Sequence, residues 1–186
     1  DPFRVLSLTF TNKAAAEMKE RIIQLIGGEA RNLWMGTFHS VFARLLRREA
    51  DKLGYPQNFT IYDTDDSKAL IKSITKELGL NDSTYKASSL LGRISSMKNM
   101  LISAETYAGD TQYITEDKAA RREHFAHIYL TYNKRLFKSG AMDFDDLLFQ
   151  TNMLLRDHPD VLLKYQHKFK YIMVDEYQDT NFSQYM

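Results

Sequence analysis

Residues 171–181 read YIMVDEYQDTN, and this stretch decides the expected fold class. Its first four residues are apolar and predict a buried strand, and Asp175 and Glu176 follow where that strand would leave its sheet. Ligands of open α/β sheets bind outside the carboxyl ends of the strands. One carboxylate at such a place can hold Mg²⁺, and a second can orient or deprotonate an attacking water. An isolated Asp-Glu pair is also a common ending of a strand in a polar turn, so the longer string carries the specificity.

Two further strands are expected near the start of the chain. Residues 3–10 (FRVLSLTF) and 33–38 (LWMGTF) are apolar runs that are too short for helices, and they predict buried strands. A helical pattern follows each run and ends at Gly27 in the first case and at Gly54 in the second. The order strand, helix, strand, helix is typical of an α/β fold with a parallel sheet.

The middle of the chain has a different pattern. Residues 63–140 are almost wholly helical in periodicity, with three expected helices and a loop at 102–115. The charged residues 116–123 are expected to face water in the first turns of the third helix. The α/β pattern then returns with a helix capped by Asp143, and Asp146 stands three positions later, as in a capping box. We therefore expect a helical insertion inside a split α/β domain.

The composition limits the classes of function. Lys and Arg number 25 and Asp and Glu number 24, so the net charge of +1 does not indicate nucleic-acid binding, which must rest on local clusters of cations. The chain has no cysteine, which excludes disulfides, thiolate metal sites and cysteine nucleophiles and suits a cytoplasmic setting. No apolar run approaches the roughly 20 residues that span a bilayer, so no membrane partner is expected. Because the sequence starts at Asp1 without Met or a signal peptide, we expect a piece of a larger chain.

The turns after the first two expected strands offer groups that could contact nucleic acid. Thr11 and Asn12 begin a helix whose free backbone N–H groups can take a phosphate, and Phe10 could stack on a base. After the second strand, Thr37 and His39 can hydrogen-bond a phosphate. The structural alternatives stay open: Phe10 as a core residue, Asn12 as a helix cap, and His39 as an ordinary structural histidine.

Four segments together carry a family resemblance. They are LTFTNKAAAEMKERI at 8–22, GTFHS at 36–40, MDFDDLL at 142–148 and DEYQDTN at 175–181. In this order they resemble motif Ia, the TFH segment, the return from the inserted domain and motif II of the UvrD/PcrA/Rep-type superfamily 1A DNA helicases. The resemblance implies an internal piece of such an enzyme, which runs from motif Ia to motif II and includes the inserted helical domain 1B.

The resemblance implies a fold as well. This fold is of the α/β class, with a partial P-loop NTPase (RecA-like) parallel sheet and a mainly α-helical inserted domain. Residues 1–54 and 142–186 would form parts of the split ATPase domain 1A. Residues 55–141 would form domain 1B, whose extent could reach 41–166.

Roles for individual residues follow from the resemblance. Glu176 would be the catalytic base and Asp175 the Mg²⁺ ligand of motif II. Coupling of the nucleotide site to neighbouring motifs would involve Gln178, Asp179 and Thr180. The residues that contact DNA would be Phe10, Thr11, Asn12, Thr37, Phe38 and His39.

The implied parent is an ATP-dependent 3′–5′ single-stranded DNA translocase and helicase of DNA repair or replication. Its cofactors would be ATP and Mg²⁺, and its partners would be single-stranded and duplex DNA and the remaining helicase domains 2A and 2B. No G-x-x-x-x-G-K-[ST] phosphate loop occurs in the 186 residues, and motifs III to VI would follow Met186. The 186 residues alone are therefore expected to be inactive and to bind neither cofactor.

Other interpretations of the same residues remain. A non-catalytic nucleic-acid or protein-binding module could keep this fold without the motor, and an unrelated helical scaffold would make the string at 175–181 a coincidence. Helix capping explains the acidic residues of 142–148 more simply than a metal site does. Arg44, Arg47 and Arg48 lie on one expected helix, and such clusters are usually solvated faces.

Overall fold

The computed structural model describes the backbone of all 186 residues and the side chains of all except Glu29, Arg31 and Asn32. The chain divides into two compact units, one formed by residues 1–57 and 150–186 and the other by residues 58–149. The domain bounds expected from the sequence divide the chain at 141/142. In the structure residues 141–143 pair with residues 60–62 inside the second unit.

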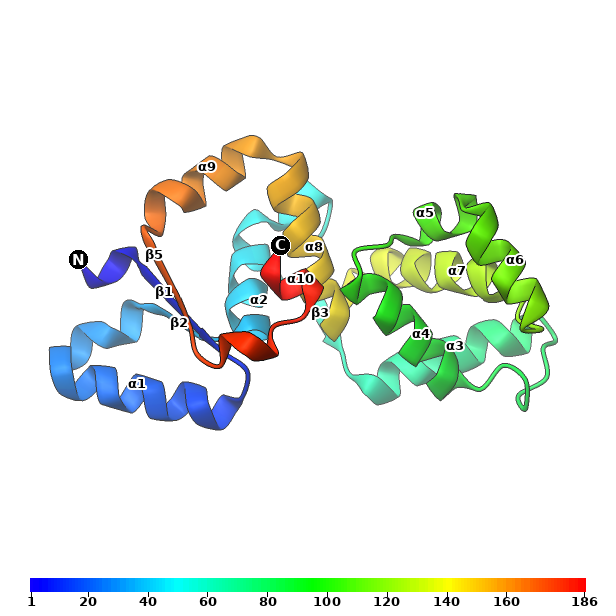
Figure 1. Cartoon of the computed structure of the whole chain (residues 1–186), viewed down its shortest axis with the longest axis horizontal. Helices are drawn as coiled ribbons and strands as arrows, with labels where there is room; N and C mark the ends of the chain where they lie inside the picture. The colour runs from blue at the N-terminus through cyan, green and yellow to red at the C-terminus, as the bar shows by residue number, and fades with distance from the viewer. The chain divides into compact units, whose positions relative to one another are not determined.

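The first unit combines a parallel sheet with helices (Figure 1). Its elements are β1 (Val5–Thr9), α1 (Asn12–Ile26), β2 (Trp34–Thr37), α2 (Phe38–Glu49), the end of α8 (Phe144–Asp157), α9 (Pro159–Lys168), β5 (Tyr171–Val174) and α10 (Phe182–Tyr185). Short 3-10 turns lie at Pro2–Arg4, Gly27–Asn32, Ala50–Leu53 and Tyr177–Asp179. The prediction of a mixed α/β fold with parallel strands is confirmed.

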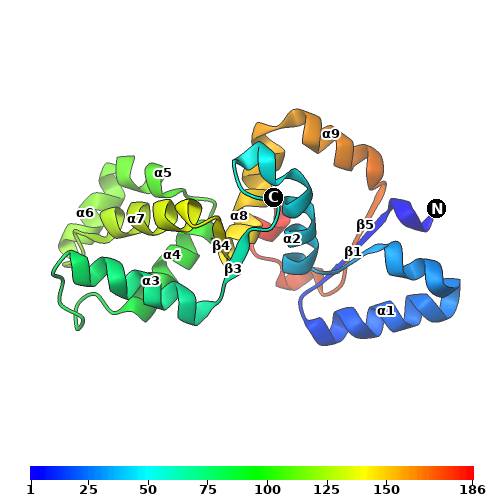
Figure 2. The ribbon, with the colours of Figure 1, turned by 180° about the vertical axis from the view of Figure 1, so that it is seen from behind.

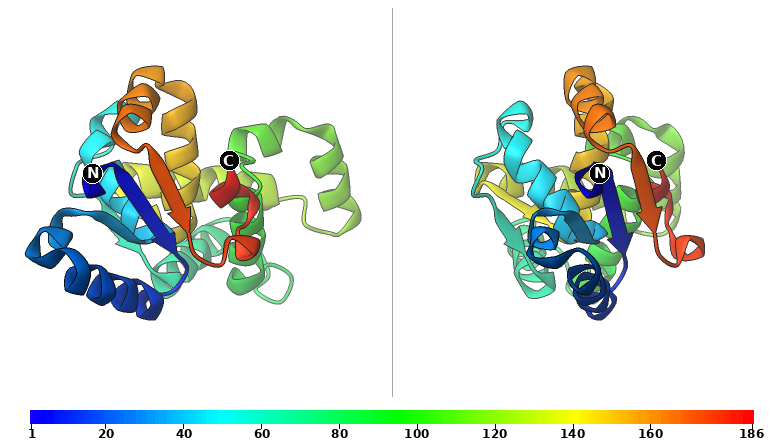
Figure 3. Two further views of the ribbon diagram at one scale, coloured as in Figure 1. Left: turned by 60° about the vertical axis from the view of Figure 1, so that its left-hand side comes forward. Right: turned by 90° about the vertical axis from the view of Figure 1, so that its left-hand side faces the viewer.

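The central strand of this sheet is β1, and both of its neighbours run parallel to it. Thr9 of β1 pairs with Thr37 of β2, and Leu8 of β1 pairs with Val174 of β5. The strand order is therefore β2-β1-β5, and Figure 3 shows β1 and β5 side by side. Because all three strands point the same way, their carboxyl ends lie at one edge of the sheet.

The prediction of a buried strand at 171–174 is correct for the strand and wrong for its burial. Tyr171, Ile172 and Met173 are 67%, 65% and 62% exposed. In the sheet that the structure describes, β5 is an edge strand with β1 as its neighbour. An apolar run of this kind is typical of a strand covered on both faces, and here these side chains remain uncovered.

The second unit is mainly helical (Figure 2). Its elements are β3 (Thr60–Tyr62), α3 (Thr64–Glu77), α4 (Ala87–Asn99), α5 (Ala104–Gly109), α6 (Thr111–Ala119), α7 (Phe125–Lys138), β4 (Ala141–Asp143) and the start of α8. Aromatic and aliphatic side chains from α3, α4, α5 and α7 form its core, among them Ile71, Ile94, Tyr107, Tyr129 and Tyr132. In the part of the chain that the structure describes, no helix is both long and apolar enough to cross a membrane.

Two expectations for this unit are corrected. The expected loop at 102–115 contains α5 and the start of α6, which are capped by Ser103 and Asp110. The charged segment 116–123 does not lie wholly in water, because Asp117 is 1% exposed. Its carboxylate accepts hydrogen bonds from the Tyr107 hydroxyl (2.7 Å) and from Arg93 (3.1 Å), which compensate for the burial of its charge.

A buried ion cluster of Lys98, Asp143 and Asp146 lies at the start of α8. The Lys98 ammonium lies 2.8 Å from an Asp143 carboxylate oxygen and 2.7 Å from an Asp146 oxygen. Asp143 and Asp146 also form the expected capping box through two backbone N–H groups, at 2.8 and 3.1 Å. Burial and the neighbouring Asp143 charge raise the pKa of Asp146 to about 7. Burial opposes ionisation of Asp143 as well, but the Lys98 ammonium lowers the pKa of Asp143.

Replacing Lys98 with methionine should destabilise the protein strongly. The change keeps the length of the side chain but leaves two buried carboxylates without their cation, which costs about 3–5 kcal/mol. Urea unfolding measured at neutral pH checks this loss. The matched control is Lys72→Met on the exposed face of α3, which we expect to alter stability by less than about 0.5 kcal/mol. Equal losses in the two variants would contradict the role of Lys98.

The raised pKa of Asp146 predicts how the free energy of unfolding depends on pH. A carboxyl group with a folded pKa near 7 and an unfolded pKa near 3.9 costs stability as pH rises through this interval, because only the unfolded chain ionises it freely. The stability of Asp146→Asn relative to the natural chain should therefore increase between pH 4 and pH 8, by an amount on the order of a few kcal/mol. Urea unfolding of both proteins across this range measures it. A difference that stays constant with pH would show that Asp146 does not take up this proton.

Candidate functional site

The acidic pair follows β5 directly. The backbone N–H of Asp175 continues the strand pairing by donating to the Leu8 carbonyl (2.9 Å). Glu176 adopts a left-handed backbone conformation (φ 52°), which costs a non-glycine residue roughly 1–2 kcal/mol. The Gln178 amide donates to the Glu176 carboxylate, and both acidic side chains are exposed. The chain therefore turns away from the sheet at the acidic pair, with the Glu176 carboxylate held by Gln178.

The turn after β1 contains Phe10, Thr11 and Asn12. The Thr11 hydroxyl oxygen accepts the backbone N–H of Ala14 (3.1 Å), so Thr11 is the cap of α1 and Asn12 is its first residue. The side chains of Thr11 and Asn12 are exposed, and that of Phe10 is partly buried. The Phe10 ring lies 5.4 Å from the Phe38 ring, so Phe10 contacts the core and still reaches the surface.

The turn after β2 is more enclosed. Thr37 is 7% exposed, and its hydroxyl oxygen accepts the Ser40 N–H (3.2 Å), while the Ser40 hydroxyl donates to the Thr37 carbonyl (2.9 Å). Phe38 is 2% exposed and packs between the rings of Phe10 and Phe42. His39 is partly exposed. Thr37 and Phe38 therefore form the turn, and His39 presents a polar group at its surface.

The strand register brings these three segments to one edge of the sheet. Residues 10–12, 37–39 and 175–176 follow the carboxyl ends of β1, β2 and β5, which are adjacent in the sheet. Neighbouring strands lie about 4.8 Å apart, so the three turns span on the order of 10 Å. The sequence indicates Thr37 and Ser40 as residues that can cap the helix after β2. In the structure Thr37 is the cap, and the Ser40 hydroxyl closes the turn through its bond to the Thr37 carbonyl.

The donor set at this edge fits a metal ion that arrives with a nucleotide. Among the residues whose side chains are described, no group of three or more His, Asp or Glu side chains could hold a metal ion. Asp175 and Glu176 offer two carboxylates. Mg²⁺ is commonly bound through one or two carboxylates together with substrate phosphates and water. The arrangement therefore fits Mg²⁺ bound jointly with a nucleotide better than an ion held by the protein alone.

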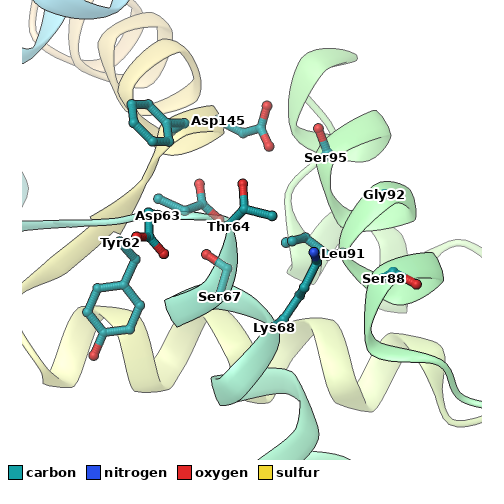
Figure 4. A pocket seen from close by; sticks show the side chains of 12 residues that line it. Tyr62, Asp63, Thr64, Ser67, Lys68, Ser88, Leu91, Gly92, Ser95 and Asp145 are labelled. Atoms are coloured by element: carbon teal, nitrogen blue, oxygen red, sulfur yellow. The ribbon is translucent and has the colours of Figure 1, made fainter. Parts of the chain in front are cut away.

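The second unit contains a pocket of about 290 Å³ at the amino ends of α3 and α8 and along α4 (Figure 4). Lys68 and the hydroxyl groups of Thr64, Ser88 and Ser95 line it. Asp63, on its wall, caps α3 by accepting two backbone N–H groups at 2.8 Å. None of the residues predicted from the sequence to contact nucleotide or DNA lines this pocket.

The turn after β2 requires a glycine at position 36. Gly36 has φ 151°, and a Cβ atom there would lie 2.5 Å from the Ser40 Oγ that bonds to Thr37. Gly36→Ala should therefore cost about 1–3 kcal/mol of stability and disturb the cap of α2. The control is Gly92→Ala within α4, where an added Cβ meets no atom within 4 Å and should stabilise by about 0.5–1 kcal/mol. Thermal unfolding of the two variants measures these changes. A Gly36→Ala variant as stable as the natural chain would refute the requirement for glycine at position 36.

Comparison with known proteins agrees with this geometry. The chain matches the family described as "UvrD/REP helicase N-terminal domain" over residues 1–186. It is 44% identical to the ATP-dependent DNA helicase PcrA of Staphylococcus aureus (strain Mu50) over 185 residues, and to that of Bacillus subtilis (strain 168) over 189 residues. These alignments cover 99% and 100% of the chain and 24% of each relative, so the chain spans about a quarter of the length of these relatives. The chain belongs to the UvrD/REP helicase family, and its whole length corresponds to the N-terminal domain of that family.

Proposed function

We propose that this chain is part of an ATP-driven motor that moves 3′ to 5′ along single-stranded DNA and unwinds duplex DNA. The observation that supports the proposal most directly is the parallel register. It sets Asp175 and Glu176 beside the turns at 10–12 and 37–39. The relatives bear the name ATP-dependent DNA helicase, which agrees with a site that joins nucleotide chemistry to a DNA track.

Asp175 and Glu176 take different roles in the proposed site. Asp175 continues the strand through its backbone bond to Leu8, which fixes where its carboxylate could coordinate Mg²⁺. The strand ends before Glu176, which has a left-handed backbone, and the bond from Gln178 would orient the Glu176 carboxylate to accept a proton from the attacking water. When bound with ATP, Mg²⁺ would neutralise charge on the phosphates. Gln178, Asp179 and Thr180 would couple the nucleotide site to the neighbouring helicase motifs.

The proposed DNA track uses the exposed groups of the other two turns. Phe10 would stack on a base, and Thr11, Asn12 and His39 would contact phosphate or sugar. The burial of Thr37 and Phe38 would give these two residues a positioning role, because the Phe38 ring packs against the Phe10 ring. The chemistry, after β5, would thus lie beside the track on the β1 and β2 turns, which suits the coupling of hydrolysis to movement.

The proposal assigns the two units to different parts of a helicase. The unit of residues 1–57 and 150–186 would be part of the RecA-like ATPase domain 1A, and the unit of residues 58–149 would be the inserted domain 1B. Domains 2A and 2B would be its partners in the complete cytoplasmic enzyme. The 186 residues contain no G-x-x-x-x-G-K-[ST] phosphate loop, so they should hydrolyse no ATP by themselves.

The test is the ATPase activity of the full-length protein in which Glu176 is replaced by glutamine. Loss of the general base should lower the single-stranded-DNA-stimulated turnover by about 10²–10⁴-fold. Binding of single-stranded DNA should be unchanged, because Glu176 lies outside the proposed DNA contacts. The matched control is Glu105→Gln at an exposed position of α5, which should leave both properties intact.

Turnover that is unchanged in Glu176→Gln would remove this residue from the proposed role. A full-length protein with no DNA-stimulated ATPase at all would favour the alternative of a non-catalytic binding module. Direction is measured separately on duplexes with a 3′ or a 5′ single-stranded tail. Preferential unwinding of the 5′-tailed duplex would contradict the proposed polarity.

A further inference from the structure

Three cations gather around the single tryptophan of the chain. The guanidinium carbons of Arg44 and Arg48 lie 4.3 and 4.9 Å from the centroid of the Trp34 ring, and the Lys168 ammonium lies 4.4 Å from it. Arg44 and Arg48 come from α2 and Lys168 from the end of α9. The ring itself is 4% exposed. Arg44, Arg48 and Lys168 are called the Trp34 cation cluster below.

The cluster concentrates positive charge without a matching anion among the described side chains. Glu49 is the nearby buried carboxylate, and it already accepts from the Lys164 ammonium (2.5 Å) and the Tyr165 hydroxyl (2.9 Å). None of the three cluster side chains has an ion pair with a described carboxylate. Contact with an aromatic face stabilises each cation, but it does not remove the repulsion between them.

Burial and the repulsion between these cations lower the pKa of two of them. Burial and the Arg48 charge lower the pKa of Arg44. Burial together with Arg48, Arg44 and Lys164 lowers the pKa of Lys168. Keeping the three cations charged and close together therefore costs electrostatic free energy, which a bound anion would offset.

The cluster lies away from the proposed nucleotide and DNA site. Trp34 is the first residue of β2 and Thr37 the last, so the cluster is at the amino end of the strand, about 10 Å from its carboxyl end. Phe169, which packs edge-on against Trp34, directly precedes the residue that leads into β5. Binding at this surface can therefore be measured independently of the carboxyl edge.

We propose that the Trp34 cation cluster is a second nucleic-acid contact, which binds backbone phosphates without reading sequence. Guanidinium groups form forked hydrogen bonds to phosphate oxygens, and a duplex offers closely spaced charges that three cations can meet together. The aromatic rings beneath are covered, with Trp34 at 4% and Tyr165 at 6% exposure, so the surface offers charge and little apolar area. That favours a phosphodiester backbone over an acidic peptide, whose recognition also uses pockets for side chains.

The test uses Trp34 as a local reporter. A short duplex is titrated into the chain, and the intrinsic fluorescence of the single tryptophan is followed at several salt concentrations. We expect a saturable change in emission as phosphates displace or reorient the cations over the indole ring. The double variant Arg48→Gln with Lys168→Gln should reduce the slope of log affinity against log salt by about 1.8. If the variant and the natural chain bind equally at 1 M salt, the variant should therefore bind about 60-fold more weakly than the natural chain at about 0.1 M salt.

Controls separate this surface from other sites and from misfolding. Arg47 lies on the same helix, and its side chain donates to the Gln57 carbonyl. Arg47→Gln removes one positive charge from this helix and should retain the Trp34 response. Circular dichroism confirms that all variants are folded. Phe10→Ala, at the proposed single-strand track, should weaken the binding of single-stranded DNA, whereas the double variant should weaken the binding of duplex, so failure of one site is distinguishable from failure of the other.

Two outcomes would overturn the inference. Duplex binding and salt dependence that are the same in the folded double variant as in the natural chain would show that the cluster does not contact phosphates. A poly-glutamate peptide that produces the same Trp34 response with equal or tighter binding than the duplex would show that the cluster takes an acidic polypeptide instead.

Discussion

The parallel pairing of β1 with both β2 and β5 is the constraint on which the candidate site depends. Position 174 is far from positions 8 and 37 in sequence, and only the register of Leu8 with Val174 and of Thr9 with Thr37 brings their turns together. Parallel neighbours need a long crossover between them, and the connection from β1 to β5 contains β2 and then the whole helical unit. Inserting that unit leaves the site intact as long as β5 returns in the same register beside β1.

A second constraint, the buried Lys98 ammonium, acts within the helical unit. It joins α4 to the capping box that begins α8, so the last element of the helical unit starts at a fixed place. The Tyr132 hydroxyl donates to Asp143 as well (2.9 Å), which adds α7 to the same cluster. Buried charges of this kind contribute more to defining one arrangement than to net stability, because their desolvation offsets much of their attraction.

The sequence was informative where a local rule determines the structure, and uninformative where a distant partner does. The cap at Asp143, the helix end at Gly27 and the strands at 5–9 and 171–174 follow from residue type and spacing. The three-residue strands β3 and β4 exist through their pairing with each other, and they are too short to show alternation. The burial of Lys98 could not be predicted from its place in the last turn of a helix, because its two carboxylate partners lie 45 and 48 positions away in the sequence. The exposure of β5 was missed because an apolar run does not reveal whether anything covers it.

What distinguishes a structural acid from a candidate functional one is whether its bonding capacity is already used. Asp143 and Asp146 are buried, and each of their carboxylate oxygens already has a backbone N–H or the Lys98 ammonium as a partner. Asp175 and Glu176 are exposed at a strand end, where an incoming ion or water can reach them. The same comparison applies to the arginines of α2. Arg47 donates to the Gln57 carbonyl and Arg44 to the Leu33 carbonyl, but Arg44 also lies over the Trp34 ring together with Arg48 and Lys168. Residues of one type, three positions apart on one helix, therefore have different capacities to bind a partner, and only their neighbours in space decide which.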